Sequence, residues 1–463
     1  MKKFNTSPIS GAQELLPETQ AVFNNLKNKI AKTFKAHGYL DIETPSIERT
    51  EILLAKAGGD TEKQIYKVIK TAESADSANQ ALRFDHTVPL ARYVIEHEND
   101  LNFPFKVQQT GPNFRGERAQ KGRFREFYQC DIDIIGRDQL SLAYDADVIS
   151  TLLDAFKIFD LDTPVLARIS NRKILAGLLN SLGLKEQTLE ISNIIDHAEK
   201  VTLEQTKTSL EELKLDKKQV KTILNFIDLN GPRSDVITAL NNLEINDDIF
   251  YQGVSELDQV LGLLEAIGLN DQITADLKII RGLDYYTGTV FEFILPEHKN
   301  IGSVAGGGRY DNLTGHFSAK AFPGVGGSIG LTRLFYVLNE AKLLNLGGQE
   351  LTEYALIPIS EQENEYAFKL ANELRSKHHS ATVVLTDKKL GDKLAYAAKI
   401  AAGGIVIGEA EMESGQLKVK DFDTGKSRDF SFTTEDLLTS NSQKPSTDPT
   451  DFWTDPSEPS TFL

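Results

Sequence analysis

The sequence predicts an α+β protein of several domains, in which runs of strands and runs of helices are largely separate. Three observations lead to this prediction. Strand patterns fill residues 105–135 and return at 281–338, the residues between them at 168–270 are helix-like, and strands alternate with helices from residue 353 onward. Separate runs of strands and helices are typical of α+β folds, whereas alternation favours a parallel sheet.

The first predicted element is an amphipathic helix near the N-terminus. Apolar side chains recur on one helical face at intervals of four residues, at Val22, Leu26, Ile30 and Phe34. Gly38 follows in a good position to end this helix. The next segment, YLDIETPSIE, predicts a short strand that Pro45 must interrupt, because proline has no N–H to donate to a strand ladder. The segment KTAESADSANQ, residues 70–80, predicts a mobile loop.

The most patterned stretch is FYQCDIDII, residues 127–135. One face of the predicted strand carries Tyr128, Cys130, Ile132 and Ile134. Successive side chains of a strand point to opposite faces, so the other face presents Gln129, Asp131, Asp133 and Ile135. Three polar groups in a row indicate that this strand lines a wet cavity.

Changes in composition predict the domain boundaries. The sheet-bearing domain occupies residues 1–167 and 271–345, and a leucine-rich helical insertion at 168–270 interrupts it. Residues 346–438 predict a small α/β domain with a largely parallel sheet. Residues 439–463 are rich in proline, serine, threonine and aspartate, and they predict a disordered acidic tail.

Overall composition limits the possible functions. The net charge of −16 over 463 residues argues against a protein that coats nucleic acid non-specifically, although a local basic patch remains possible. Cys130 is the single cysteine, so an intramolecular disulfide is excluded. The N-terminus lacks the apolar run of a signal peptide, and no stretch is long enough to span a membrane. We therefore expect a cytoplasmic protein without a membrane partner.

An arginine-rich loop stands out in this acidic chain. The segment NFRGERAQKGRFREF, between two predicted strands, contains Arg115, Arg118, Lys121, Arg123 and Arg125. A solvated hairpin tip is the ordinary interpretation of such a run. However, the planar fork of arginine suits phosphate oxygens, and neighbouring strands point polar groups toward the same region. These features favour a phosphate-binding role.

Two further regions carry candidate chemistry. The segment RGLDYYTGTVFEF, residues 281–293, begins a strand with Arg281, Asp284, Tyr285 and Tyr286. Periodicity alone favours a salt bridge beside two core tyrosines over a binding site here. The glycine runs in SVAGGGRYDNL and FPGVGGSIGLTRLF permit close approach of the backbone to a ligand or another strand. The chain contains no P-loop, dinucleotide fingerprint, H-E-x-x-H segment or cysteine pair, so we expect no protein-held metal.

Taken together and in this order, these segments resemble one family. The strand ending at Pro45, the FRGE loop and GVGGSIGLTRL are similar to motifs 1, 2 and 3 of the class II aminoacyl-tRNA synthetases. RGLDYYTGTVFEF and AGGGRYD resemble the two signature segments of the histidyl-tRNA synthetase family. The resemblance spans residues 8–435. It implies a class II catalytic domain, an antiparallel sheet flanked by helices, together with a helical insertion and a C-terminal α/β anticodon-binding domain. It also implies histidine activation with ATP and Mg²⁺, transfer to tRNA(His), and a homodimer.

The resemblance implies roles for individual residues. Those implied to bind histidine are Asp85, His86, Thr87, Arg115, Gln129, Asp133, Arg281, Tyr285 and Tyr286. Among them, Asp133 and Tyr286 would read the imidazole, and Asp85, Thr87 and Gln129 would take the α-amino end. Those implied to bind ATP are Arg115, Glu117, Arg123, Phe127 and Arg333. Arg115 and Arg281 would be the catalytic cations at the α-phosphate.

Two alternative functions remain open at this point. One is a synthetase-like regulatory subunit that binds histidine or a partner enzyme without activating the amino acid, and the other is a non-catalytic RNA sensor. Regulatory relatives typically lack the RGLDYY segment and the anticodon domain, and both are present in this sequence. His86 departs from the family pattern, which commonly has an aliphatic residue there, and a titratable ring at this point predicts a pH dependence.

Overall fold

The computed structural model describes residues 4–55, 62–71, 79–118, 122–280, 285–311, 315, 320–344 and 352–431. The chain divides into two compact units, with the division between residues 347 and 348. Several sequence predictions fall outside the described residues. These are most of the loop at 70–80, Lys121, Arg281, Asp284 and the tail at 439–463.

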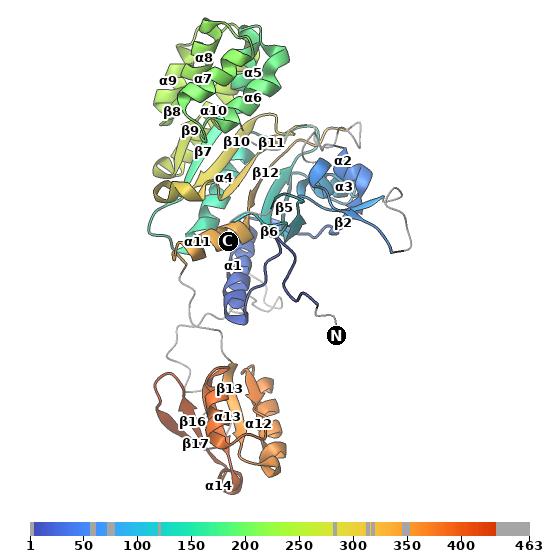
Figure 1. Ribbon diagram of the computed structural model, residues 1–463, viewed down its shortest axis with the longest axis vertical. Helices are drawn as coiled ribbons and strands as arrows, with labels where there is room; N and C mark the ends of the chain where they lie inside the picture. Colours follow the sequence, from blue (N-terminus) through green and yellow to red (C-terminus); the bar gives the residue numbers. More distant parts are fainter. Residues whose placement is uncertain are drawn as a thin grey trace, which may run out of the picture. The chain divides into compact units, whose positions relative to one another are not determined.

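A nine-stranded sheet forms the centre of the first unit (Figure 1). In spatial order its strands are β1 (Leu40–Asp41), β5 (Phe105–Phe114), β6 (Glu126–Ile135), β12 (Gly324–Ile329), β11 (Ala305–Tyr310), β10 (Thr289–Ile294), β7 (Leu166–Asn171), β9 (Ile273–Asp276) and β8 (Asn230–Gly231). Neighbouring strands are antiparallel except for the pairs β1/β5 and β7/β9. The sheet flanked by helices that the family resemblance implies is confirmed, and its antiparallel pairing holds except at these two pairs.

Three helices pack against one face of β5, β6 and β12: α1 (Pro17–Ala36), α4 (Ala143–Phe156) and α11 (Leu331–Glu340). The predicted apolar face of α1 is buried, except that Phe23 rather than Val22 packs fully into the core. A repeat of four residues drifts around a helix with 3.6 residues per turn, so the first position of the stripe rotates away from the core. Gly38 follows the helix with a φ of +84°, as expected for a residue that ends a helix.

A second layer covers part of the opposite face of the sheet. It consists of α2 (Thr50–Leu54), α3 (Thr87–Glu96) and a three-stranded sheet of β2 (Ile47–Arg49), β4 (Gln80–Leu82) and β3 (Lys67–Val68). Pro45 lies between β1 and β2, which confirms that it interrupts the predicted strand. Apolar residues of this layer pack with Tyr285 and Tyr310, so the layer brings α3 next to the end of β11 and to the segment that precedes β10.

Six helices follow β7 along the chain: α5 (Arg172–Ser181), α6 (Thr188–His197), α7 (Leu203–Glu212), α8 (Lys217–Ile227), α9 (Arg233–Asn241) and α10 (Asp248–Ala266). Figure 1 shows them gathered at the end of the sheet formed by β7, β8 and β9. The predicted helical character of this region is therefore correct. Their buried residues belong to the same apolar cluster as those of the sheet. Within the described part of the chain, every helix is too short or too polar to cross a membrane.

The second unit has a five-stranded sheet with its own apolar cores. The strand order is β14 (Ala381–Val383), β13 (Thr352–Pro358), β15 (Ala401–Ile407), β16 (Gln416–Asp421) and β17 (Ser427–Ser431), and the helices are α12 (Asn364–Ser376), α13 (Leu390–Ala397) and α14 (Glu409–Ser414). β13 pairs in parallel with β14 and β15, whereas β15/β16 and β16/β17 are antiparallel. The prediction of a largely parallel sheet was wrong for the half of the sheet formed by β15, β16 and β17. The connections after β15 are too short for the long crossover that parallel neighbours require.

Candidate functional site

A narrow cavity lies over the polar face of β6. Gln129, Asp131 and Asp133 line it. Residues of opposite parity on the same strand, among them Cys130 and Ile132, are buried in the apolar core. The alternation seen in the sequence therefore predicted correctly which side of this strand is polar.

Asp85 and Thr87 reach the cavity from the start of α3. The Asp85 carboxylate accepts a hydrogen bond through Oδ1 from the backbone N–H of Val88, at 3.1 Å. Burial raises the pKa of Asp85 to about 6, although the Val88 hydrogen bond and the Arg115 charge oppose this shift. Asp85 is therefore partly protonated in mildly acidic solution when the cavity is empty.

Arg115 enters the cavity from the end of β5. Its Nε donates to the carbonyl oxygen of Phe84 at 3.0 Å, and its guanidinium lies 5.1 Å from the centre of the Phe127 ring. Both contacts fix the orientation of the planar fork. Among the lining residues that the structure describes, Arg115 carries the one positive charge.

Three tyrosines form the opposite wall. The Tyr285 ring makes edge-to-face contacts with Tyr286 and Tyr310, with ring centres 5.0 and 5.9 Å apart. The Tyr310 hydroxyl donates to Oδ1 of Asp133 at 2.8 Å. Burial raises the pKa of Asp133 well above its usual range, and the Tyr310 hydrogen bond opposes that shift. Asp133 is thus an acceptor held in one orientation by an aromatic neighbour.

Glycines of β11 and β12 make room for these side chains. A Cβ atom on Gly326 would lie 2.0 Å from Oδ1 of Asp133, and one on Gly324 would lie 2.3 Å from Cε2 of Tyr310. A Cβ on Gly308 would lie 3.0 Å from the Tyr286 ring. The predicted close approach at the glycine runs is therefore correct, and it serves the lining side chains of the cavity.

The cavity contains buried acceptors without a protein partner. Oδ2 of Asp85 and Oδ1 of Asp131 are both buried and receive no hydrogen bond. Buried polar atoms are nearly always satisfied, so open acceptors of this kind indicate a ligand that donates hydrogen bonds. Asp85 and Asp131 lie at the part of the cavity where we predict the α-amino end of histidine to bind.

His86 occupies a different position from its sequence neighbours. It precedes α3 and is buried, and Nδ1 lies 2.7 Å from Oδ2 of Asp131. It does not line the cavity. Sequence adjacency to Asp85 and Thr87 suggested direct contact with a ligand, whereas the structure places the His86 ring behind Asp131.

The structure brings together most of the residues predicted to bind histidine. Those that line the cavity are Asp85, Thr87, Arg115, Gln129, Asp133, Tyr285 and Tyr286. Arg281 lies outside the described residues.

The other residues predicted to bind ATP lie elsewhere. Glu117, Phe127 and Arg333 do not line this cavity, and Arg123 lines a larger neighbouring cleft together with Tyr286. Arg123 pairs with Glu117 at 3.3 Å, and Arg333 donates to the carbonyl oxygen of Ile301 at 2.9 Å.

Three lining side chains received no role in the sequence predictions: Asp131, Tyr310 and Ser328. Asp131 could have been found, because it shares the alternating polar face with Gln129 and Asp133. Tyr310 belongs to the AGGGRYD segment, but the contact of its hydroxyl with Asp133 joins residues 177 positions apart. No local pattern encodes that contact.

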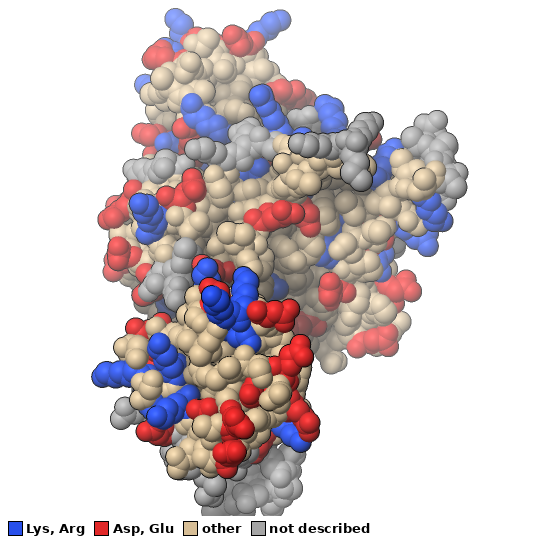
Figure 2. Space-filling view, turned by 60° about the horizontal axis from the view of Figure 1, so that its bottom comes forward, with Lys and Arg blue, Asp and Glu red and all other residues tan. Residues whose placement is uncertain are grey.

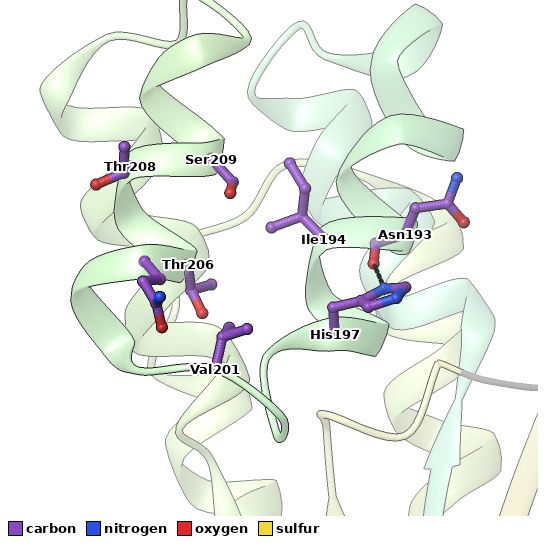
Figure 3. A pocket seen from close by; sticks show the side chains of 8 residues that line it. Asn193, Ile194, His197, Val201, Thr206, Thr208 and Ser209 are labelled. Carbon is purple, nitrogen blue, oxygen red and sulfur yellow. Dashed lines mark hydrogen bonds between the residues drawn. The ribbon is translucent and has the colours of Figure 1, made fainter. Parts of the chain in front are cut away.

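Another pocket lies between α6 and α7 (Figure 3). Its lining includes Asn193, Ile194 and His197 of α6 and Val201, Thr206 and Ser209 from the segment that follows, and Ile194 points toward α7. His197 Nδ1 lies 2.9 Å from the backbone oxygen of Asn193, within its own helix. This pocket lacks the convergent charged groups of the cavity over β6, so the cavity over β6 is the candidate active site.

Comparison with known proteins agrees with this assignment. The family model described as histidyl-tRNA synthetase matches residues 11–334, and the model described as anticodon binding domain matches residues 353–437. The histidine–tRNA ligase of Clostridium tetani is 43% identical over 435 residues, which is 93% of this chain and 98% of the relative. The histidine–tRNA ligase of Clostridium acetobutylicum is 40% identical over 429 residues, with coverage of 92% and 98%.

A solved structure gives the same result for the fold. The histidyl-tRNA synthetase of Nostoc sp. PCC 7120 superimposes with a TM-score of 0.80 at 35% identity, covering 93% of this chain and 97% of that one. The catalytic part is therefore a class II synthetase domain, followed by an anticodon-binding domain. The chain belongs to the histidyl-tRNA synthetase family, whose members are ATP-using aminoacyl-tRNA synthetases.

Proposed function

We propose that this chain ligates L-histidine to tRNA(His), with the cavity over β6 as its active site. In the first step the histidine carboxylate attacks the α-phosphorus of ATP, pyrophosphate leaves and histidyl-adenylate forms. In the second step a hydroxyl of the terminal ribose of the tRNA attacks the histidyl carbonyl carbon, and AMP leaves. The observation that carries this proposal is that seven of the nine residues predicted to bind histidine line one cavity.

Histidine selection would depend on two groups that flank the imidazole. A neutral imidazole has one donor and one acceptor nitrogen, so a carboxylate and a phenol on opposite sides recognise it well. Asp133 and Tyr286 both line the cavity and supply these groups. The contact between the Tyr310 hydroxyl and Asp133 supports this role, because it leaves the second carboxylate oxygen of Asp133 for the ligand.

The activation step requires cations where charge develops on the phosphates. We assign this task to Arg115 and, from its place in RGLDYY, to Arg281. Phe127 would stack on the adenine and Glu117 would face it, while Arg123 and Arg333 would hold the outer phosphates. Mg²⁺ would enter with ATP as part of the substrate, because this ion keeps several waters and binds phosphates with few protein ligands.

The second unit would bind the anticodon region of the tRNA. Figure 2 shows lysine and arginine side chains gathered on one part of the visible face of this unit and acidic side chains on another. Lys418 and Lys420 alternate with buried residues along β16 and are exposed. Such a charge division suits an RNA backbone in a chain that is acidic as a whole.

A homodimer in the cytoplasm completes the proposal. β1 lies at the edge of the nine-stranded sheet, and edge strands present unpaired backbone groups to a partner. Leu40 on β1 is 61% exposed and Ile47 on β2 is 47% exposed. Leu40 lies within the strand ending at Pro45 that resembles motif 1, and Ile47 lies two residues after Pro45, which supports a subunit interface at this edge. Sedimentation velocity of the purified protein tests this part.

The regulatory and RNA-sensor alternatives are disfavoured. The relatives compared above are named as ligases over nearly the whole chain, and the anticodon-binding model matches residues 353–437. A regulatory subunit would also not need RGLDYY, which this chain retains.

The decisive experiment is ATP–pyrophosphate exchange measured separately with each standard amino acid. Exchange with histidine alone is the expected result, and a folded dimer without any exchange would contradict the proposal.

Arg281→Ala should slow single-turnover adenylate formation by roughly a hundred- to a thousandfold while histidine and ATP binding change less. Arg281→Lys should restore only part of that rate, since a point charge cannot replace a planar fork.

A further inference from the structure

We infer that Asp131 is a further histidine-binding residue that takes the α-ammonium group together with Asp85, and that His86 is the positioning residue that holds Asp131 in place. This inference rests on the proposed function of the cavity. It changes the role of His86 from contact with the substrate to support of a neighbouring carboxylate.

The first observation is that the two carboxylate oxygens of Asp131 have different surroundings. Oδ2 lies 2.7 Å from Nδ1 of His86, and the side chains of the pair are 5% and 1% exposed. An ionised carboxylate only accepts hydrogen bonds, so Nδ1 of His86 carries the proton. Oδ1 is buried without a partner, and Asp131 lines the cavity. His86 thus fixes one oxygen and leaves the other for the ligand.

The side-chain amide of Asn113 also lies near the His86 ring, and its contacts agree with a proton on Nδ1. Nδ2 of Asn113 lies 3.4 Å from Nδ1 of His86, but it donates to Oε1 of Gln129 at 2.7 Å. An N–H at the shorter distance forms the stronger hydrogen bond, so Asn113 does not compete for the His86 nitrogen. Gln129 in turn is oriented by Asn113 on one side and by Ser328 on the other.

The second observation is the match between open acceptors and an ammonium group. An ammonium has three N–H donors. The cavity offers Oδ2 of Asp85, Oδ1 of Asp131 and the hydroxyl of Thr87, and the two carboxylate oxygens have no protein partner. Asp133 already accepts from Tyr310 and is assigned to the imidazole. Asp85 and Asp131 therefore remain for the amino end.

The charge balance supports the same assignment. Three aspartates line the cavity, and Arg115 is the single cation among its described lining residues. Buried charges are costly unless they are paired. The positive α-ammonium of histidine offsets part of this excess, whereas a ligand without an amine leaves the negative charge of these side chains uncompensated.

The ring of His86 is enclosed on its far side. A Cβ atom on Gly111 of β5 would lie 3.4 Å from Nε2 of His86 and 2.6 Å from Nη2 of Arg83. The backbone oxygen of His86 accepts from the side chain of Gln109 at 3.4 Å. β5 therefore packs against the His86 ring at Gly111, and His86 acts on the substrate through the Asp131 carboxylate.

The first test compares ligands with and without the amine. Asp131→Asn should weaken histidine binding about ten- to a hundredfold, because a charge-assisted hydrogen bond is lost, while ATP binding stays within about threefold. The amine-free analogue 3-(imidazol-4-yl)propionate, measured as a competitor of histidine, should bind the parent and Asp131→Asn alike. An equal loss of affinity for both ligands would overturn the ammonium assignment, and unchanged histidine affinity would overturn the role of Asp131.

The second test is a double-mutant cycle. His86→Leu should raise the KM for histidine several-fold with little change in the KM for ATP, and adding it to Asp131→Asn should cause no further loss. His86→Asn should recover part of the loss, since its amide nitrogen can replace Nδ1 as a donor. Additive losses would show that His86 acts independently of Asp131. Where the analogue binds both proteins too weakly to measure, this cycle decides the question.

His37 and Asp154 provide the matched control. Nε2 of His37 lies 3.0 Å from Oδ2 of Asp154, and neither residue lines the cavity. Asp154→Asn should leave both KM values unchanged. Thermal unfolding of each variant identifies any that fail to fold, and His86→Asn is the milder substitute.

The proposed function and the present inference fail in different ways. A parent protein without histidine-dependent exchange contradicts the proposed function, whereas exchange that Asp131→Asn leaves intact contradicts only the present inference.

Discussion

At the scale of single residues, the cavity concentrates buried carboxylates that are useful for binding and unfavourable for stability. Burial raises the pKa of Asp85 to about 6 and that of Asp133 well above its usual range. A carboxylate with a raised pKa in the folded state favours folding below its unfolded pKa of about 4. For Asp85 this contribution disappears as the pH rises through about 6, so at neutral pH this carboxylate is a destabilising buried charge that a cationic ligand offsets.

Asp85→Asn should therefore change stability and binding in opposite directions. At pH 8 the neutral amide removes the buried charge, so the free protein should gain up to roughly 3 kcal/mol of unfolding free energy. At pH 5 the gain should fall to about half, because the folded carboxyl is mostly protonated while the unfolded one is still ionised, and it should vanish only below the unfolded pKa of about 4. Histidine affinity at pH 8 should fall. Thermal unfolding at both pH values, together with calorimetric binding, checks this; a destabilised variant at pH 8 would contradict it.

Tyr310→Phe removes the hydroxyl that donates to Asp133. The KM for histidine should rise about five- to a hundredfold, the range for a lost hydrogen bond to a buried polar group, and the KM for ATP should change less. The same hydrogen bond opposes the raised pKa of Asp133, so its loss raises that pKa further. The acidic fall in histidine affinity should consequently move to higher pH in the variant. An unshifted pH profile would argue against this contact.

At the scale of elements, glycines determine how closely neighbours pack. In the helical region, α5 and α10 approach through Gly177 and Gly253. A Cβ on Gly177 would lie 2.4 Å from the backbone nitrogen of Phe250, and one on Gly253 would lie 2.7 Å from that of Ile174. Backbone atoms cannot move aside as flexible side chains can, so these two positions require glycine.

Gly177→Ala should accordingly lower the stability of the first unit by about 1–3 kcal/mol, because the added methyl overpacks the contact between the helices. The gain in helix propensity from alanine is smaller than this strain. Gly391 in α13 has no heavy atom within 4 Å of its potential Cβ, so Gly391→Ala is the matched control. It should be neutral or stabilise by up to about 1 kcal/mol. Differential scanning calorimetry of both variants measures the contrast, and equal effects would contradict the packing argument.

At the scale of the whole molecule, the chain has two units with separate apolar cores. The cores of the second unit form between its own sheet and helices, so this unit contains the contacts that a small domain needs to fold. The candidate cavity is lined entirely by residues of the first unit. Activation of the amino acid and recognition of the anticodon are thus assigned to different units.

Separating the units tests this division. Residues 348–463 should fold alone and unfold cooperatively on heating, as followed by circular dichroism. Residues 1–347 should retain histidine-dependent pyrophosphate exchange and lose most tRNA charging, since the proposed anticodon contacts are removed. Loss of exchange in a folded 1–347 protein would show that the second unit supports the active site.

Several features were predictable because they depend on local periodicity. The face of α1 that packs on the sheet follows from apolar side chains at Leu26, Ile30 and Phe34, and the polar face of β6 follows from the alternation around Asp131. The glycine runs of β11 and β12 predicted close approach correctly. The motif resemblance then indicated a class of enzyme and most of the residues that line the cavity.

By itself, the sequence determined the helices and strands, their buried faces and the family. The periodicity of apolar residues and the short motifs depend only on residues that are close together in the sequence. Only the tertiary structure decided which side chains meet. The Tyr310 hydroxyl reaches Asp133 across 177 residues, and His86 pairs with Asp131 although it stands between two residues that line the cavity. The order of strands places β11 and β6 on either side of β12, which fixes the first contact, and packing of α3 against the sheet fixes the second. Their geometry depends on distances between elements, and the periodicity of one element contains no information about the distance to another.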